Sequence, residues 1–397
     1  MTTLKHILIH YGEIALKKGN RRFFEDRLRR NTLAALNGIP VDNLRHDYDR
    51  FVLTVDDTVS NEKIIERLKH VMGITHFSIA EPGDPDINIL KKQVFDQVKD
   101  MEFQSFKIDT RRADKNYPMT SVEVNREVGA KIHLELNKPV DLTNPDLTCR
   151  IEIFNKKIFF YCRRIEGQRG LPVGSSGKVV CLLSSGIDSP VAAYRMMTRG
   201  CSVIFVHFHS FPFTDKNSYH NALKLANMLT KYQNRTKIYF VPLAEIQQVI
   251  IESAPAKFRL LLYRRMMFRL AEMIARRERA KALITGESVG QVASQTLENI
   301  AATSEVVKIP VLRPLIGMDK EMIVDQAREL GTFTTSIEPY DDCCSFLVPK
   351  NPETRAKLPE IHAAEEKLGA IRELLKKAIY ERELKKITYP EDGFSEK

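Results

Sequence analysis

The stretch Val179-Val-Cys-Leu-Leu-Ser-Ser-Gly-Ile-Asp-Ser-Pro190 sets the fold of the larger part of this chain. It begins with five uninterrupted apolar residues, a pattern typical of a strand that is covered on both faces of its sheet. Small residues follow, including Gly186, and then Pro190, which suits the first turn of a helix because its missing N–H is not needed there. The stretch therefore predicts a strand, a tight loop and a helix in immediate succession.

Apolar strands continue to alternate with helices beyond this stretch. Strands are expected at residues 179–183, 202–207, 237–241, 282–285 and 308–312, and helices at 190–198, 217–232 and 243–279, the last with a break at Pro255. Such alternation indicates a doubly wound parallel sheet with helices on both faces, in which ligands bind at the C-terminal ends of the strands. We place this α/β domain at residues 178–397 and expect the part after residue 345 to be mostly a charged helix.

The first 168 residues have a different order of elements. Residues 1–80 read as strand, helix, two strands, helix and strand, which is the ferredoxin-like pattern. Residues 81–168 predict a second small α+β domain, which begins with the turn-rich residues 81–86. Residues 169–177, rich in Gly and Ser, predict a linker to the α/β domain.

Composition predicts a soluble globular protein with two or three domains. The chain has 397 residues, 43% of them hydrophobic, and lacks an apolar run of about 18 residues that could span a membrane. The N-terminus does not have the basic, apolar and small-residue order of a signal peptide, so we expect a cytoplasmic protein without a membrane partner. Six cysteines show neither CxxC nor Cys/His spacing, so we expect no structural metal site and read four of them as buried fillers.

A net charge of +10 permits binding to a polyanion but does not demonstrate it. Local basic clusters point the same way, although each is also compatible with a solvated helix face. These clusters contain Arg21, Arg22, Arg27, Arg29 and Arg30; Arg111, Arg112 and Lys115; and Arg259, Arg264, Arg265 and Arg269. RNA binding therefore needs support beyond charge.

The loop between the strand and helix of the opening stretch has the residues of an anion-binding site. Gly186 and its small neighbours let backbone N–H groups approach a phosphate closely, and the helix N-terminus adds the positive end of its dipole. The hydroxyls of Ser184, Ser185 and Ser189 supply further donors. The loop is neither GxxxxGKS/T nor GxGxxG, which excludes those two nucleotide-binding motifs.

Ser184-Ser-Gly-Ile-Asp-Ser189 resembles the SGGxDS signature of the PP-loop ATP pyrophosphatases, with Ser185 where that family has glycine. Those enzymes activate a carbonyl oxygen by adenylation and release pyrophosphate. Other motifs, in order along nearly the whole chain, resemble the tRNA uridine 4-sulfurtransferase family, also called 4-thiouridine synthetase. They are Tyr11-Gly-Glu-Ile-Ala-Leu-Lys-Lys-Gly-Asn-Arg21, Thr285-Gly-Glu-Ser-Val-Gly-Gln-Val-Ala-Ser-Gln295, Arg313-Pro-Leu-Ile-Gly-Met-Asp-Lys320 and Tyr340-Asp-Asp-Cys-Cys-Ser345. Asp109-Thr-Arg-Arg-Ala-Asp-Lys115 and Val140-Asp-Leu-Thr-Asn-Pro-Asp146 resemble a THUMP domain, an RNA-binding module.

The resemblance implies a PP-loop fold for residues 178–397, a THUMP domain for residues 81–168, and ATP and Mg²⁺ as cofactors. It implies a catalytic role for Asp188 and Lys320, which without it would be read as a helix-start carboxylate and a surface lysine. RNA contacts are expected at Arg111, Arg112 and Lys115 of the THUMP-like segment. Positions where the family contacts ATP, together with the anion-binding loop, are Leu182, Leu183, Ser184, Ser185, Gly186, Ser189, His207, Phe208, Arg264, Gly286 and Gln295.

The family also implies a cysteine that carries the sulfur as a persulfide. Cys344 matches this position, and the neighbouring Cys343 is left open as an alternative carrier. We expect no rhodanese domain after Cys344, unlike in some relatives, and therefore an external cysteine desulfurase as the sulfur donor. A homodimer and a role in thiamine biosynthesis are further expectations from the family.

The expected reaction adenylates the C4 oxygen of a tRNA uridine, at position 8 in the family, and replaces this oxygen with sulfur. Its products are 4-thiouridine, AMP and pyrophosphate. Three alternatives stay open: a PP-loop amidating enzyme, for which no glutaminase segment is visible; a cluster-dependent 2-thiolation enzyme, for which paired CxxC ligands are missing; and a catalytically inactive tRNA-binding protein.

Overall fold

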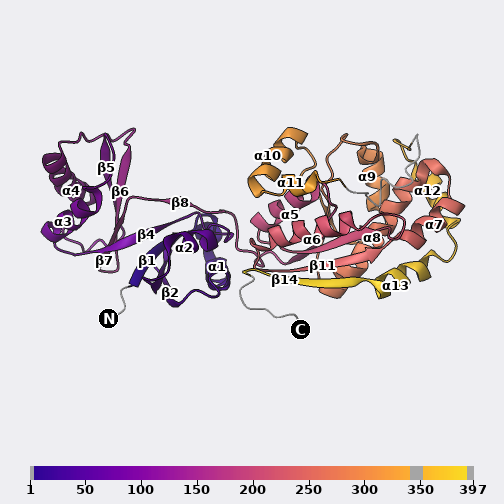
Figure 1. The fold of residues 1–397 in the computed structure, drawn as a ribbon, viewed down its shortest axis with the longest axis horizontal. Coiled ribbons are helices and arrows are strands. Elements are labelled where there is room, and N and C mark those ends of the chain that lie inside the picture. The colour runs from indigo at the N-terminus through magenta and orange to yellow at the C-terminus, as the bar shows by residue number, and fades with distance from the viewer. Residues whose placement is uncertain (1–3, 340–351, 391–397) are drawn as a thin grey trace. The chain divides into compact units, whose positions relative to one another are not determined.

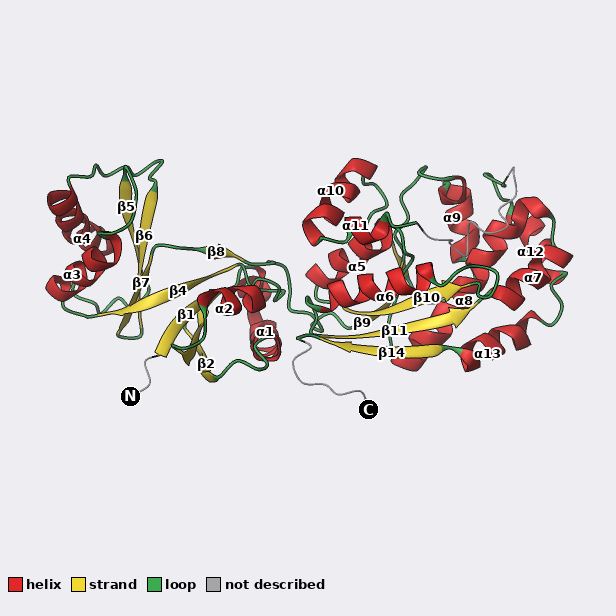
Figure 2. Ribbon diagram, in the orientation of Figure 1, coloured by secondary structure: helices red, strands yellow, loops and turns green. Residues whose placement is uncertain are grey.

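The computed structural model describes residues 4–339 and 352–390. The chain divides between Gly170 and Leu171 into two compact units, each with helices and one sheet (Figure 1). Figure 2 distinguishes the helices from the strands in both units. The predicted class, a doubly wound α/β domain preceded by α+β segments, is confirmed.

The first unit, Met1–Gly170, holds the ferredoxin-like pattern and the second α+β segment in one sheet. Its elements are β1 (Leu4–His10), the 3-10 helix η1 (Glu13–Asn20), α1 (Arg21–Ala35), β2 (Val41–Asp47), β3 (Arg50–Asp56), α2 (Asn61–Leu68), β4 (His76–Gly83), α3 (Ile87–Val98), β5 (Phe106–Arg112), α4 (Ser121–Leu136), β6 (Leu147–Phe154), β7 (Lys157–Tyr161) and β8 (Ile165–Glu166). The strand order is β2-β3-β1-β4-β7-β6-β5, with β8 paired to β4. β5 and β6 run parallel, and the other paired strands are antiparallel.

β4 joins the two halves of this sheet. Its residues 76–80 pair with β1, and Glu81, Pro82 and Gly83 pair with β7. The turn predicted at these last three residues is wrong, because they continue strand β4. The strand tolerates Pro82 because β4 pairs with one described strand rather than two at this position. The predicted domain bound between residues 80 and 81 therefore falls inside a strand.

A buried polar cluster lies where the two halves of the sheet meet. Arg50 of β3 is fully buried and forms an ion pair with Glu152 of β6, which is 4% exposed. The hydroxyl of Tyr161 donates to Glu152 Oε1 at 2.6 Å, and His10 Nε2 lies 3.1 Å from the same carboxylate. Burial is the main cause that lowers the pKa of His10 to about 3, so its ring is neutral at physiological pH. Glu152 is thus a main partner of the buried Arg50 charge.

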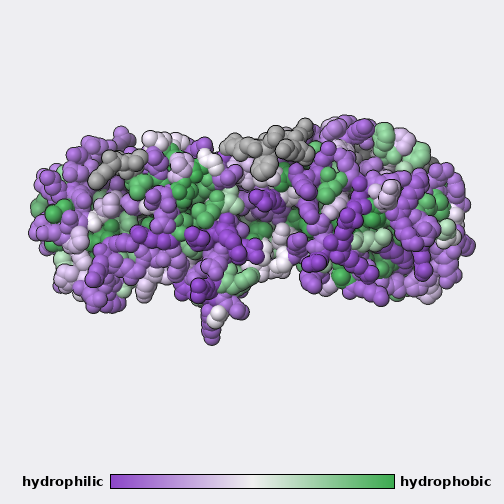
Figure 3. Space-filling view, turned by 90° about the horizontal axis from the view of Figure 1, so that it is seen from below, coloured by the Kyte–Doolittle hydropathy of each residue, from purple (hydrophilic) through white to green (hydrophobic). Residues whose placement is uncertain are grey.

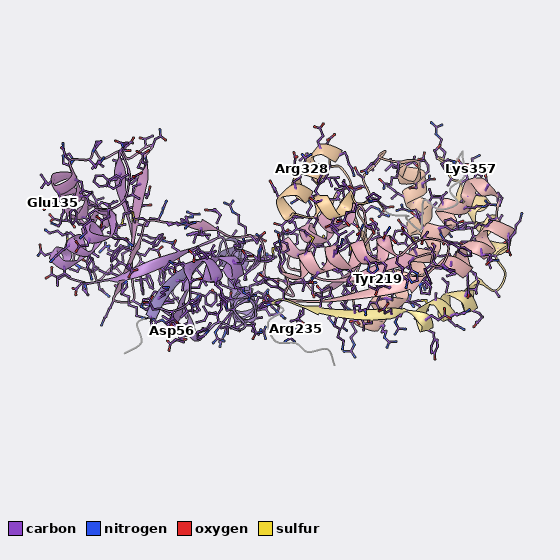
Figure 4. The ribbon with its side chains drawn as sticks, in the orientation of Figure 1. Asp56, Glu135, Tyr219, Arg235, Arg328 and Lys357 are labelled. Atoms are coloured by element: carbon purple, nitrogen blue, oxygen red, sulfur yellow. The ribbon has the colours of Figure 1, made fainter. Side chains whose placement is uncertain are left out.

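Glu152→Ala should lower the free energy of unfolding by up to about 3 kcal/mol, because it removes one of the two carboxylates that pair with the buried Arg50 and leaves only Asp49. Glu135→Ala is a matched control: Glu135 is exposed on α4 (Figure 4), and its surface pair with Lys131 contributes at most about 0.5 kcal/mol. Urea unfolding of both full-length variants, followed by circular dichroism, measures the difference. Equal unfolding midpoints would show that the Arg50–Glu152 pair does not stabilise the unit.

The second unit, Leu171–Lys397, has a six-stranded sheet in its described part. Its elements are β9 (Lys178–Leu182), α5 (Asp188–Thr198), β10 (Ser202–His209), α6 (Asn217–Thr230), β11 (Arg235–Pro242), α7 (Ala244–Ser253), η2 (Ala256–Phe258), α8 (Arg259–Glu278), β12 (Leu283–Ile284), η3 (Ala293–Gln295), α9 (Leu297–Ser304), β13 (Val311–Leu312), α10 (Lys320–Leu330), α11 (Phe333–Ser336), α12 (Leu358–Glu366), α13 (Ile371–Glu381) and β14 (Glu383–Thr388). The strand order is β13-β12-β9-β10-β11-β14. Strands β9 to β13 pair in parallel, and β14 is antiparallel to β11.

The chain reverses its direction of travel across this sheet at β9. It moves from β9 to β10 and β11 on one side, and then returns to β12 on the other side of β9. Because such crossovers are right-handed, α5 and α6 cover one face of the sheet and α8 covers the other. α10 and α11 pack beside α5 and α6 (Figure 1). The carboxyl ends of β9 and β12 therefore form the switch point where ligands bind in sheets of this kind.

Two sequence predictions for this unit had opposite outcomes. The break at Pro255 is confirmed, since α7 ends at Ser253 and α8 begins at Arg259. The single charged helix expected after residue 345 is wrong, because the described part of this segment holds α12, α13 and β14. β14 is an edge strand and mostly exposed, so its sequence lacks the apolar alternation that signals a strand. Backbone pairing with β11 forms it instead.

Residues 171–177, expected as part of a linker, are the first residues of the second unit. Leu171 is buried, and the N–H groups of Gly174 and Ser176 donate to the carbonyl of Gly200 at 2.8 and 3.0 Å. Gly200 has a φ of +82°, a conformation that favours glycine. The segment is therefore an ordered part of this unit, while the predicted domain bounds themselves stay predictions.

Hydrophilic residues dominate the face shown in Figure 3, with smaller hydrophobic areas between them. Buried hydrophobic residues form a large cluster in the second unit and smaller clusters in the first. Within residues 4–339 and 352–390, no helix combines the length and the apolar character that crossing a bilayer requires.

Candidate active site

A cavity of about 370 Å³ lies at the carboxyl ends of β9, β10 and β12, with α8 along one wall. This is the switch point of the sheet. Asp188 lines the cavity, as do nine of the eleven residues predicted to contact ATP. Those nine are Leu182, Leu183, Ser184, Ser189, His207, Phe208, Arg264, Gly286 and Gln295. The fold thus brings together residues from four separate parts of the sequence.

Serine hydroxyls hold the loop between β9 and α5 in shape. The N–H of Ser184 donates to Ser189 Oγ at 2.9 Å, and the N–H of Gly186 donates to Ser184 Oγ at 3.2 Å. These contacts wrap the loop around the N-terminus of α5, where free N–H groups and the helix dipole favour an anion. The loop is therefore shaped in advance for a phosphate or carboxylate group.

Ser185 and Gly186 do not line the cavity that the described residues form. The Ser185 hydroxyl is buried and donates to the carbonyl of Ser218 in α6 at 2.8 Å, rather than facing an anion as expected. His207 also binds backbone, since its Nδ1 lies 2.9 Å from the carbonyl oxygen of Leu183 and must donate to it. Ser185 and His207 therefore fasten the loop to α6 and β10.

Gly286, which follows β12, lies against the start of α5. A Cβ at this position would come within 2.8 Å of backbone atoms of both Asp188 and Ser189. Glycine allows this approach because it has no side chain. The contact holds the segment after β12 beside the anion-binding loop, so that both border the same cavity.

The Asp188 carboxylate binds two donors from distant elements. Its Oδ1 lies 2.5 Å from Lys320 Nζ at the start of α10, and its Oδ2 accepts from Gln291 Nε2 at 2.9 Å. The side chains of Asp188 and Lys320 are 20% and 44% exposed, so the pair stays accessible to a ligand. The structure thus places the two residues predicted for catalysis in direct contact.

A second carboxylate, that of Glu287, is buried at the cavity wall. It forms ion pairs with Arg264 of α8 and with Arg313, which follows β13. The Thr285 hydroxyl donates to it at 2.8 Å. Burial is the largest influence on the pKa of Glu287 and raises it, but the two guanidinium groups and the hydrogen bonds together hold that pKa below its ordinary value. Glu287 is therefore an ionised acceptor for three donors.

Cys343 and Cys344 lie outside the described residues. The remaining four cysteines are free thiols: Cys149, Cys181 and Cys201 are buried, and Cys162 is half-buried. Burial raises the pKa of Cys181 and of Cys201, which disfavours the reactive thiolate. Their burial agrees with the prediction that they are apolar fillers.

The three residues predicted to contact RNA lie together at the end of β5 in the first unit. Arg111 is exposed and pairs with Asp49. Arg112 Nη1 donates to the carbonyl oxygens of Lys115 and Tyr117 at 3.3 and 3.0 Å. Arg112 thus shapes the loop that carries the exposed Lys115, while Arg111 and Lys115 are accessible to a partner.

Known families match the chain along most of its length. The models match residues 6–78 as the ThiI ferredoxin-like domain, 85–163 as a THUMP domain and 174–370 as thiamine biosynthesis protein (ThiI). A protein named "Probable tRNA sulfurtransferase" from Thermoanaerobacter pseudethanolicus is 43% identical over 363 residues, which cover 91% of this chain and 95% of that protein. Its namesake from Halothermothrix orenii is 43% identical over 395 residues, covering 97% and 99%. The chain belongs to the tRNA sulfurtransferase family.

A solved structure agrees with this assignment to the tRNA sulfurtransferases. The crystal structure of a 4-thiouridine synthetase–RNA complex with bound ATP matches with a TM-score of 0.88 and 35% identity, covering 97% of this chain and 100% of the other. The predictions of a tRNA sulfurtransferase, with ferredoxin-like, THUMP and PP-loop parts, are thereby confirmed. The roles predicted for individual site residues stay predictions.

Sequence reasoning about this tRNA sulfurtransferase missed Glu287, which lines the cavity, and it missed Gln291 and Arg313, which bind the carboxylates of Asp188 and Glu287. All three lie inside motifs that carried the family resemblance. A carboxylate two residues after a predicted apolar strand was a usable signal for Glu287, because such strand ends meet at the ligand site. Nothing in the spacing indicates that Arg313 and Arg264 converge on it.

Gly286→Ala should lower the free energy of unfolding by about 1–3 kcal/mol, because the added Cβ meets rigid backbone at Asp188 and Ser189. Gly317→Ala is the control, since a Cβ at this exposed position meets open space and should change stability by less than about 0.5 kcal/mol. Thermal unfolding followed by circular dichroism compares the two variants. A Gly286→Ala protein as stable as the control would contradict the close backbone approach.

Proposed function

We propose that this chain uses ATP to adenylate the C4 oxygen of a uridine in tRNA and then replaces that oxygen with sulfur. The products are 4-thiouridine, AMP and pyrophosphate. One observation carries the proposal: a preshaped anion-binding loop borders a cavity lined by nine of the residues expected at ATP. The solved family member, bound to RNA and ATP, supports it.

The cavity fits a nucleotide in size and in chemistry. Its volume of about 370 Å³ lies within the usual range of small-molecule sites, roughly 300–1,000 Å³. Arg264 lines it, and the side chain of Arg264 is 19% exposed, so part of it is open to a ligand in the cavity. A guanidinium group forms charge-assisted hydrogen bonds with phosphate oxygens, so it suits the phosphates of a nucleotide.

The proposed chemistry solves a leaving-group problem. The C4 oxygen of uridine leaves poorly, so sulfur does not displace it directly. When this oxygen attacks the α-phosphorus of ATP, a C4–O–P link forms and the bond to pyrophosphate breaks. Sulfur then adds at C4 and AMP leaves with the former C4 oxygen, so that each step expels a stable anion.

Asp188 and Lys320 would act beside the phosphates. Asp188 holds the ammonium of Lys320 at the cavity, where its charge would stabilise the negative charge that develops on the phosphoryl oxygens. Mg²⁺ is compatible with this arrangement, because it binds one or two carboxylates together with substrate phosphates rather than an all-protein cage. The described residues accordingly hold no cluster of three or more His, Cys, Asp or Glu side chains, and Asp188 would be the ligand. Bound Mg²⁺ would polarise the phosphoryl group.

Sulfur delivery is assigned in this proposal to Cys344, with Cys343 as the alternative, and to an external cysteine desulfurase as donor. Direct attack by the terminal sulfur of a persulfide links C4 to the cysteine through an S–S bond. A second thiol, supplied by Cys343 or by an external thiol reductant, must then break that bond and is oxidised with the first to a disulfide. If the same thiol exchange first releases sulfide, the sulfide attacks C4 without this link. Either route uses the thiolate or persulfide anion as the reactive form.

For tRNA binding we propose the first unit, supported by the THUMP match at residues 85–163 and by the exposed side chains of Arg111 and Lys115. Exposed basic residues bind the phosphate backbone with strong dependence on salt. The homodimer, the role in thiamine biosynthesis and the cytoplasmic location stay predictions. The alternative of a catalytically inactive tRNA-binding protein is disfavoured by the accessible Asp188–Lys320 pair at the cavity.

Asp188→Ala should reduce tRNA-dependent pyrophosphate release by about 100-fold or more, because it removes the anchor of Lys320 and the carboxylate for Mg²⁺. Its affinity for tRNA should stay at the parental value. The control is Asp325→Ala, which removes an exposed carboxylate of α10 that pairs with Arg328, labelled in Figure 4. Parental rates of pyrophosphate release from Asp188→Ala would exclude this pair from the active site.

Cys344→Ser should still bind tRNA and release pyrophosphate but yield little 4-thiouridine when a cysteine desulfurase supplies the sulfur, since the variant lacks the proposed sulfur carrier. Cys343→Ser should retain substantial product. Mass spectrometry of nucleosides from the treated tRNA measures both. The opposite pattern would move the persulfide to Cys343, and normal product from the double variant would remove both cysteines from the mechanism.

A further inference from the structure

The buried carboxylate of Glu287 joins three separate elements at the cavity wall. Glu287 is 2% exposed and follows β12, while its partners come from the second turn of α8 and from the segment after β13. Arg264 binds its Oε1, and Arg313 Nε lies 2.7 Å from its Oε2. Each oxygen of the carboxylate therefore takes one guanidinium group.

The two arginines differ in what else they contact. Arg313 also donates to the carbonyl of Val311 at 3.4 Å and to the hydroxyl of Ser304, and it does not line the cavity formed by the described residues. Arg264 lines the cavity, and its side chain is 19% exposed. Arg313 is thus bound into the protein on several sides, whereas Arg264 presents part of its side chain to the cavity.

The backbone that carries Glu287 is fixed on both sides. Gly286 lies against Asp188 and Ser189, as described above, and the Ser288 hydroxyl donates to the carbonyl of Met318 at 3.0 Å. The position of the carboxylate therefore follows from the same turn that borders the anion-binding loop. A fixed carboxylate gives a fixed place to the guanidinium that binds it.

We infer that Glu287 is a positioning residue for ATP, which holds Arg264 against the cavity wall with its remaining donors directed to the nucleotide. The inference rests on the proposed function, because it names ATP as the ligand. A free arginine side chain loses rotamer freedom when a ligand immobilises it, and this loss weakens binding. Glu287 imposes that order before ATP arrives. Its negative charge also compensates two guanidinium groups that the wall could not otherwise bury together.

Calorimetric titration with ATP and Mg²⁺, without tRNA, tests the inference on the full chain. The parent, Glu287→Gln, Arg264→Met and the double variant form a double-mutant cycle. Glu287→Gln and Arg264→Met should each weaken ATP binding by about 10- to 100-fold, the effect of one charge-assisted hydrogen bond. Adding Glu287→Gln to Arg264→Met should weaken binding by less than about threefold further, because Glu287 acts through Arg264.

Arg313→Met is the matched control. It breaks an ion pair with the same carboxylate but removes no side chain from the cavity, so ATP affinity should stay within about threefold of the parent. Glu287→Asp keeps the charge and withdraws it by one methylene, so this variant should fold and still lose ATP affinity. It replaces Glu287→Gln in the comparison if that variant does not fold. Thermal unfolding of every variant separates lost stability from lost binding.

Each outcome decides the question. Parental ATP affinity in the folded Glu287 variants overturns the inference and leaves the proposed function intact. The inference is also overturned if Glu287→Gln lowers ATP affinity by the same factor in the parent and in the Arg264→Met variant, because the two residues would then act independently. A parent chain that does not bind ATP overturns the proposed function and this inference together.

Discussion

The contact between Gly286 and the backbone of Asp188 and Ser189 is the constraint on which the cavity depends. β9 and β12 are neighbours in the sheet, so the segments that leave their carboxyl ends must share the same space. Small residues make this possible on both sides. One segment is held in shape by its own serine hydroxyls, and the other has no side chain where the two backbones meet. The cavity lies beside this contact because neither segment fills the space in front of the helix N-terminus.

Two carboxylates organise the polar walls around that contact, and they differ in accessibility. Asp188 is partly exposed and binds Lys320 and Gln291, whereas Glu287 is buried and binds two arginines. A buried ion pair is costly to break, because removing one partner leaves an uncompensated charge. A partly exposed pair exchanges its partners with water or a ligand more easily. The wall at Glu287 is therefore suited to keep a fixed geometry, and the Asp188 carboxylate is suited to exchange its partners when a ligand binds.

Features that depend on a contiguous stretch of sequence could be predicted, whereas features that depend on contacts between distant segments could not. β9, α5 and the break at Pro255 follow from contiguous patterns of apolar residues, glycine and proline, and these predictions agree with the structure. β14 and the course of β4 through Pro82 depend on pairing with strands distant in sequence, which a local pattern does not contain. The same distinction holds at the cavity. The anion-binding loop is contiguous and could be recognised, whereas the contacts of Glu287 arise only when three elements meet.

Ser185 shows how the structure resolves a departure from a sequence pattern. The PP-loop signature has glycine at this position, which would suggest a backbone conformation that only glycine adopts. Ser185 is absent from the residues with positive φ in the described part of the chain, so its conformation does not require glycine. Its hydroxyl is buried and donates to the carbonyl of Ser218, which satisfies a group that burial would otherwise leave unpaired. The position thus demands a small residue, and serine meets this demand while it adds a hydrogen bond between the loop and α6. A larger side chain would have no such space, because Ser185 is 1% exposed beneath α6.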